Sequence, residues 1–281
     1  MSIEQEEITE KEVKKINHQI VNLSFDCFEF YKFIEAIEKY VDELELVFEN
    51  NEFSITFMDA SRIMMCKCVK QLDNLTIIEK MKFAINTSDF KSILKTRKKD
   101  MKTVDFTFDN TKTYIELIKT SEKYNSKIVK TLNLLDLDLE IVPMENLNHI
   151  EYPAKVNFPI SFLDDFFYES EDYSEIVDIE IKENEGLSFS ESGTIGNSKY
   201  LIESQYCNSI EGNERGAYSY TYLTPIKPLL PILVNSDITL NIKTEHPIKL
   251  ELYLSSLDIN FLVFLAPRVE EEDFDYDDDE F

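Results

Sequence analysis

The residues that could carry metal or nucleophilic chemistry are few and widely spaced. The four cysteines are Cys27, Cys66, Cys68 and Cys207. The three histidines are His18, His149 and His246. No CxxC pair occurs, and no histidine is spaced to complete a zinc site. No nucleophile–base pair can be assigned either. We therefore expect reduced, structural cysteines, no metal, no cofactor and no enzymatic activity.

Loops that cradle phosphates and segments that cross membranes are also missing from the sequence. The chain has 281 residues but only 5 Gly, and neither GxxxxGK[ST] nor GxGxxG occurs. No apolar run approaches the ~20 residues that a membrane helix needs. The start, MSIEQEEITEKEVKK, has no apolar signal core. With 43% hydrophobic residues, 20 Phe and 14 Tyr, the composition predicts an intracellular globular protein.

Charge restricts where nucleic acid could bind. The formal net charge is −26, from 55 acids and 29 bases, and nine of the acids lie in the last twelve residues. Such a chain repels nucleic acid on average, so DNA contact requires a local basic patch. One stretch fits: Lys91 to Lys102 holds six bases and the single acid Asp100. A solvated loop is the simpler interpretation of this stretch.

Several elements are needed to position these residues. Asp26 is a plausible N-cap, and the apolar spacing from Phe30 to Leu44 predicts an amphipathic helix. A hairpin follows around Asn50-Asn51. A second short helix is expected from Ser88, and alternating apolar residues between 104 and 117 predict further strands.

Residues 132–152, LNLLDLDLEIVPMENLNHIEY, divide the chain into two similar halves. Acidic and apolar residues alternate before Pro143, which predicts an extended surface connector; a half-buried edge strand is the alternative. After it, a helix near Ile160, strands, and a proline-distorted helix at 222–233 repeat the first half at an offset of about 133 residues. Two helices on antiparallel sheet in each half predict an α+β fold.

Four motifs, in register with this duplication, resemble the proliferating cell nuclear antigen (PCNA) family of DNA sliding clamps, especially archaeal ones. They are Phe57-Met58-Asp59-Ala60-Ser61-Arg62, Leu135-Asp136-Leu137-Asp138-Leu139-Glu140, Thr244-Glu245-His246-Pro247-Ile248 and Phe264-Leu265-Ala266-Pro267-Arg268-Val269-Glu270-Glu271. The resemblance covers about 21–272. It implies a DNA-clamp fold whose three subunits form a ring. The implied parts are a flexible extension (1–20), two clamp domains (21–131 and 153–269) joined by the interdomain connector (132–152), and a disordered acidic tail (270–281).

The resemblance implies that helices line a hole through which double-stranded DNA passes without sequence readout. The matching DNA-binding residues are Lys32, Lys39, Lys91, Lys95, Lys98, Lys99 and Lys227. It also implies edge-to-edge contacts between subunits, through 126–133 of one and 198–205 of the next. The interface residues are Lys127, Ile128, Val129 and Lys130, facing Tyr200, Ile202 and Glu203.

A partner pocket between connector, central loop and C-terminal strand is the third implied site. In the family, DNA polymerase, clamp loader, ligase and flap nuclease use such pockets through short motifs. The matching residues are Met58, Arg62, Met65, Leu137, Leu139, Ile141, Pro143, Pro247, Phe264, Leu265, Ala266 and Pro267. The family functions in DNA replication and repair, which implies a nuclear location in a eukaryote or a cytoplasmic, nucleoid-associated one in an archaeon.

The sequence departs from the family where the third helix should present bases. It offers Asp164, Asp165, Glu169, Glu171 and Asp172 instead. Either these carboxylates point sideways, or the chain is one subunit of a mixed ring, or the clamp grips DNA weakly. The main hypothesis is a polymerase processivity factor. The alternative is a clamp-like regulatory or heterotrimer subunit that binds partners with little DNA grip of its own.

Overall fold

The first helix begins at its predicted cap but ends earlier than its apolar spacing suggests. The computed structural model describes residues 18–73, 75–97, 100, 102–137, 139, 142–147, 149–170 and 174–268. In it, the Asp26 carboxylate accepts two backbone N–H groups of the first turn of α1 (Cys27–Ile37). The predicted continuation to Leu44 is wrong. Leu44 is completely buried, but it lies in strand β2 (Glu43–Glu49), so its side chain packs in the core from the sheet and not from the helix.

The other elements of the first half follow the predicted order. They are β1 (Ile20–Asp26), β3 (Glu52–Met58), β4 (Met64–Gln71), β5 (Met81–Asn86), α2 (Thr87–Leu94), β6 (Lys102–Asp109), β7 (Tyr114–Ser121) and β8 (Ser126–Asn133). The predicted hairpin joins β2 to β3. Asn50 and Asn51 both have left-handed φ angles, 52° and 60°, as a tight two-residue hairpin turn requires.

The second half repeats this arrangement with more irregular helices. Its strands are β9 (Ala154–Pro159), β10 (Ile176–Lys182), β11 (Gly186–Gly193), β12 (Gly196–Glu203), β13 (Ser209–Glu211), β14 (Asn213–Ser219), β15 (Asp237–Ile242), β16 (Ile248–Leu254) and β17 (Ile259–Leu265). Its helices are α3 (Ser161–Glu169), the 3-10 turn η3 (Ser204–Tyr206), α4 (Tyr220–Leu223) and the 3-10 helix η4 (Thr224–Ile232). Pro228 and Pro231 lie inside η4, which confirms the predicted proline distortion.

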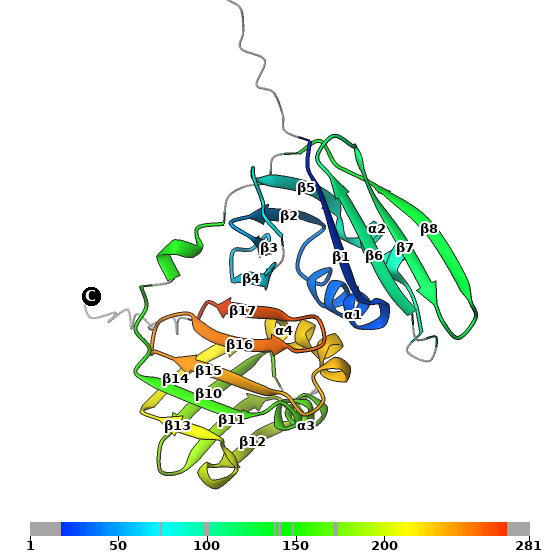
Figure 1. Ribbon diagram of the computed structural model, residues 1–281. Coiled ribbons are helices and arrows are strands. Elements are labelled where there is room, and N and C mark those ends of the chain that lie inside the picture. The colour runs from blue at the N-terminus through cyan, green and yellow to red at the C-terminus, as the bar shows by residue number, and fades with distance from the viewer. Residues whose placement is uncertain are drawn as a thin grey trace, which may run out of the picture.

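The strands form two small sheets and one large sheet, and the helices lie on one side of the molecule. The small sheets have the orders β1-β6-β7-β8 and β12-β11-β10-β14, and the large one is β13-β9-β15-β16-β17-β4-β3-β2-β5. Figure 1 shows α1, α3, α4 and η4 across the molecule from the connector, which carries η2 (Met144–Leu147). Antiparallel strands therefore dominate, and the α+β prediction is confirmed.

Equivalent aromatic pairs occupy the core of each half. The rings of Phe25 and Phe30 stack with centroids 4.5 Å apart in the first half. Phe166 and Phe189 stack at the same distance in the second. Each pair joins a helix residue, Phe30 of α1 or Phe166 of α3, to a strand of a small sheet, β1 or β11. Helix and sheet are thus held together by aromatic packing in both halves.

Strand pairing and polar contacts join the two halves. Strand β17 of the second half pairs with β4 of the first, so the large sheet is continuous. Beside this seam, Lys70 Nζ lies 2.9 Å from Asp258 Oδ2. The Tyr40 hydroxyl donates to the carbonyl oxygen of Tyr222 at 2.8 Å. Connector residues 134–137 belong to no strand, as predicted for an extended connector, whereas Asp138, Glu140 and Ile141 lie outside the described residues.

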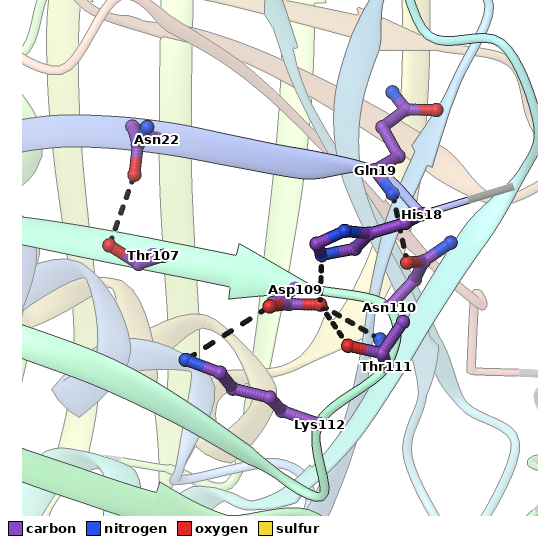
Figure 2. A network of polar contacts seen from close by, with 8 residues as sticks. All are labelled: His18, Gln19, Asn22, Thr107, Asp109, Asn110, Thr111 and Lys112. Atoms are coloured by element: carbon purple, nitrogen blue, oxygen red, sulfur yellow. Dashed lines mark hydrogen bonds and ion pairs between the residues drawn. The ribbon is translucent and has the colours of Figure 1, made fainter.

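A polar network fixes the start of β1 (Figure 2). His18 Nε2 lies 3.1 Å from Asp109 Oδ1, which also accepts the Thr111 hydroxyl at 2.6 Å. The Gln19 N–H donates to Asn110 Oδ1 at 3.0 Å. The hydroxyl and N–H of Thr111, helped by His18 and opposed by burial, lower the pKa of Asp109 to about 2. The network holds β1 against the turn that follows β6.

Candidate functional surfaces

The first helix presents a lysine that is already paired. Lys32 Nζ lies 2.6 Å from Glu35 Oε2, with both side chains about a fifth exposed. Burial raises the pKa of Glu35, but the Lys32 ammonium and the Tyr31 hydroxyl outweigh it, so the pKa is lowered. Lys39, beyond the end of the helix, is exposed. Of these two predicted DNA contacts, only Lys39 presents its charge without a close carboxylate among the described residues.

Helix α2 brings further lysines to the same side, again with a carboxylate. Lys91 Nζ lies 2.7 Å from Glu38 Oε1, while Lys95 is exposed. Two lysines from neighbouring strands donate to backbone carbonyl oxygens at the C-terminal end of α2. Lys130 Nζ donates to the oxygen of Ile93 and Lys119 Nζ to that of Lys95, each at 3.1 Å. Burial lowers the pKa of Lys119 to about 8. Sequence reasoning missed Lys119, because only the fold brings β7 beneath α2.

The third helix exposes acids where the resemblance implies bases. Asp164, Asp165 and Glu169 are all exposed, and α3 has no base in its last turn. Across from them, Lys227 Nζ lies 5.5 Å from the ring centre of Phe167, a cation–π contact. Lys98, Lys99, Glu171 and Asp172 lie outside the described residues. The described helix face is therefore of mixed charge, basic at α2 and acidic at α3.

On the connector side, three predicted pocket residues form one row across the large sheet. Met58 pairs with Met65 in the β3–β4 register, and Met65 pairs with Phe264 in the β4–β17 register. Their side chains share one face. Phe264 is only 3% exposed yet lies outside the main core cluster, so it is covered on the outer face of the sheet. The row is an apolar strip beside the central loop.

Buried Asp59 holds the central loop beside this strip. One carboxylate oxygen accepts the N–H of Met64 at 2.6 Å, and the other accepts the N–H of Ser61 at 2.9 Å. The second oxygen also accepts the Tyr222 hydroxyl at 3.0 Å. These bonds support Arg62, whose φ of 58° is left-handed. Sequence reasoning treated Asp59 as a motif residue, and the structure gives it a positioning role.

A groove of about 490 Å³ runs beneath the connector and continues the strip. Leu139, Val142 and Met144 line it from the connector. Thr56 and Lys67 line it from the sheet, two residues along their strands from Met58 and Met65 and on the same face. Its sheet side also carries the ion pairs Lys80–Glu49 and Lys82–Glu45, each 2.9 Å. Of the predicted pocket residues, only Leu139 lines this groove, so Val142 and Met144 were missed.

The other predicted pocket residues differ in how far their side chains are exposed to solvent. Leu137 is 46% exposed and Pro143 is exposed, whereas Pro247, Ala266 and Pro267 are half-buried. One prediction needs correction. Leu265 has no exposed surface and belongs to the main core, because it alternates with Phe264 and faces the helices, so its side chain cannot line the pocket. Ile141 lies outside the described residues.

Two sheet edges carry the predicted subunit contacts. Strand β8 ends the order β1-β6-β7-β8, and β12 ends the order β12-β11-β10-β14. On β8, Lys127 is exposed, Ile128 is 40% exposed and Val129 is 62% exposed, while Lys130 is half-buried. On β12, Glu203 is exposed and Tyr200 is half-buried. Both edges present unpaired backbone groups, which favour strand addition.

One predicted interface residue also needs correction. Ile202 is 1% exposed, because its side chain faces Leu187 inside its own half. A neighbouring subunit can reach its backbone but not its side chain. The neighbouring Leu201 is 48% exposed and was missed by sequence reasoning. Alternation along a strand would have identified Leu201 once the inward face was known.

Comparison with known proteins establishes the fold. No protein-family model matches the sequence, and no curated protein matches it. The structure matches that of a PCNA2–PCNA3 complex from Sulfolobus tokodaii with a TM-score of 0.77 and 18% identity. The match covers 90% of this chain and 100% of the other. The described part of the chain contains no helix with the length and apolar character to span a membrane.

Proposed function

We propose that this chain, which has the PCNA-type clamp fold, is a subunit of a ring-shaped sliding clamp. Such a clamp is not an enzyme: it encircles duplex DNA and holds replication and repair proteins on it. The observation that carries the proposal is the pair of free sheet edges, β8 and β12, at the ends of the two small sheets. An assembly that pairs β8 of each copy with β12 of the next leaves neither edge open.

The two edges also fit one another chemically. Every strand pair among the described residues is antiparallel, and an antiparallel register that sets Val129 opposite Leu201 sets Lys127 opposite Glu203. An exposed apolar pair and an opposite-charge pair then share the outer face. Registers shifted by two residues lose both matches. This favours copies of the same chain as neighbours.

Partner proteins would bind on the connector side. The Met58–Met65–Phe264 strip and the groove beneath the connector form one surface with apolar and polar parts. Methionine side chains adapt to several ligands, which suits a surface shared by polymerase, clamp loader, ligase and nuclease motifs. The exposed Leu137 gives such motifs an additional apolar contact.

A second candidate function is a regulatory or mixed-ring clamp subunit with little grip on DNA. Two of the lysines on the helix face, Lys32 and Lys91, are paired with Glu35 and Glu38. Helix α3 adds exposed carboxylates to the same side of the molecule. Both features reduce the attraction of this face for phosphates.

Two measurements test the proposal. Light scattering should give the mass of three copies of the 33.0 kDa chain, or of a mixed ring when sister subunits are supplied. Primer extension on a circular template, with the matching clamp loader and polymerase, should then give longer products than polymerase alone. A stable ring that leaves product length unchanged supports the second candidate, and a monomer that joins no ring contradicts both.

A further inference from the structure

Residues of α3 and η4 line a groove. Figure 1 shows α3 on the helix side of the molecule. Two adjoining depressions, of about 420 and 470 Å³, share Asp164, Leu230 and Val234 as lining residues. Tyr168 and Pro231 also line the first of them. We call this combined depression the α3–η4 groove. Its lining residues are not those of the connector groove.

Several apolar side chains on the walls of the α3–η4 groove are exposed to solvent. Tyr168 is 82% exposed and Val234 is 66% exposed, while Leu230 between them is half-buried. Pro228 and Pro231 restrict the backbone of η4, so its wall is preformed and a ligand would not have to order it. Apolar side chains gathered along a preformed groove are typical of a binding surface.

Two charges beside the α3–η4 groove, those of Asp165 and Glu169, are not explained by helix stability. Asp165 and Glu169 stand four residues apart on α3, where like charges repel. Glu169 is the last residue of α3, where the helix dipole disfavours a carboxylate. Among the described residues, neither acid forms an ion pair. Asp164 adds a carboxylate to the lining, where Lys227 is the one described cation.

The negative potential extends beyond the groove itself. The pKa of the Tyr200 hydroxyl is raised by burial, and then by the charges of Asp165 and Glu169. Lys227, whose ammonium lies 5.5 and 5.9 Å from the ring centres of Phe167 and Tyr220, balances only one of the three carboxylates Asp164, Asp165 and Glu169. Phosphate-bearing ligands are therefore disfavoured, and a cation is favoured.

We propose that the α3–η4 groove binds a basic peptide segment of a partner protein, with an aliphatic side chain flanked by arginines or lysines. The aliphatic group fits between Leu230 and Val234. The flanking cations meet Asp164 in the groove, and Asp165 and Glu169 at its rim. The exposed Tyr168 ring offers a cation–π contact. This site is distinct from the connector-side pocket.

Fluorescence anisotropy on the purified full chain tests this inference. The probe is a labelled nine-residue peptide with a central leucine, two arginines on each side, and Gly/Ser ends. Its control carries glutamates in place of the arginines. Micromolar binding of the arginine peptide is expected, with none of the glutamate peptide. Asp165→Lys combined with Glu169→Lys should weaken binding by about tenfold or more, and Val234→Ser by about fivefold.

A matched pair of substitutions separates the site from general charge. Asp105→Lys combined with Glu122→Lys changes the net charge equally at exposed positions of the first half, and should alter binding less than twofold. The inference is overturned if the arginine peptide does not bind, or if both double variants weaken it equally. It is also overturned if a duplex oligonucleotide competes for the groove, or if Val234→Ser changes the mass of the protein in solution, since DNA or a second copy is then the occupant.

Discussion

The Tyr222 hydroxyl donates a hydrogen bond to Asp59 Oδ2 across 3.0 Å, although the two residues are 163 positions apart. Tyr222 lies on α4, on the helix side, whereas Asp59 lies in the central loop beside the Met58–Met65–Phe264 strip. The Tyr222 carbonyl oxygen also accepts the Tyr40 hydroxyl. This chain of contacts connects the helix side of the molecule to the loop that shapes the proposed partner pocket.

Tyr222→Phe removes only the hydroxyl from this chain of contacts. The buried Asp59 carboxylate loses one donor, which should destabilise the protein by about 1–2 kcal/mol in urea unfolding. The loop around Arg62 should also loosen, so a peptide with the clamp-binding pattern should bind several-fold more weakly in calorimetry. Tyr253→Phe is the control, because its bond to Asp258 is exposed on the surface. Equal peptide affinities for wild type and both variants would show that Tyr222 does not position the pocket.

A cysteine pair can test the proposed ring interface by trapping it covalently. In a Cys207→Ser background, Val129→Cys combined with Leu201→Cys places one thiol on each free edge. If those residues lie opposite one another in neighbouring copies, mild oxidation should link up to three chains, because directly opposite strand residues are within disulfide reach. Non-reducing electrophoresis measures the product.

Two controls separate register from random collision. Thr131→Cys combined with Leu201→Cys moves the first cysteine two residues along β8, on the same face of the strand. This pair should cross-link far less. Val129→Asp should lower the assembled mass in sedimentation by placing a carboxylate in the apolar contact. Efficient linking in the shifted pair, or an unchanged mass for Val129→Asp, would contradict the proposed register.

Acid should release the start of β1. The folded-state pKa of Asp109 is about 2, below the ordinary 3.8, so the native state binds this proton less readily than the unfolded state. The stabilisation is complete above about pH 4 and is lost as the pH falls toward 2. Asp109→Asn should remove that dependence, giving a flatter melting temperature between pH 4 and 2. Asp105→Asn, exposed on the same strand, should keep the wild-type slope, and parallel curves for all three proteins would contradict the assignment.

Local signals predicted the elements well, whereas side-chain partners required the fold. Asp26 as a cap and Asn50-Asn51 as a turn act within a few residues, so the sequence alone identifies them. The strand proposed for one subunit edge coincides with β8 at both ends. The burial of Ile202, by contrast, depends on which face of β12 meets the core. The domain boundaries and site assignments that came from the resemblance stay predictions.

The sequence also did not reveal that two of the predicted DNA-binding lysines form ion pairs, which bears directly on how strongly this face can bind DNA. Both Lys32–Glu35 and Lys91–Glu38 are short ion pairs, so these ammonium groups are less available to phosphates than exposed Lys39 and Lys95. The spacing of Lys32 and Glu35 suits a pair on one helix, but Glu38 and Lys91 come from separate segments. A count of lysines along the sequence therefore overestimates the electrostatic attraction of the helix side for DNA phosphates.

Removing the paired carboxylates should strengthen the grip on DNA. Glu35→Gln combined with Glu38→Gln leaves Lys32 and Lys91 free to contact phosphates, which adds up to about 0.9 to the log–log salt slope for each new contact. Longer primer-extension products on a circular template should accompany the steeper slope. Glu45→Gln combined with Glu49→Gln changes the net charge equally but frees Lys82 and Lys80 on the connector side. That control should leave both slope and product length near wild type. If the two double variants behave alike, overall charge rather than the helix face governs DNA binding, and the ring does not hold DNA through α1 and α2.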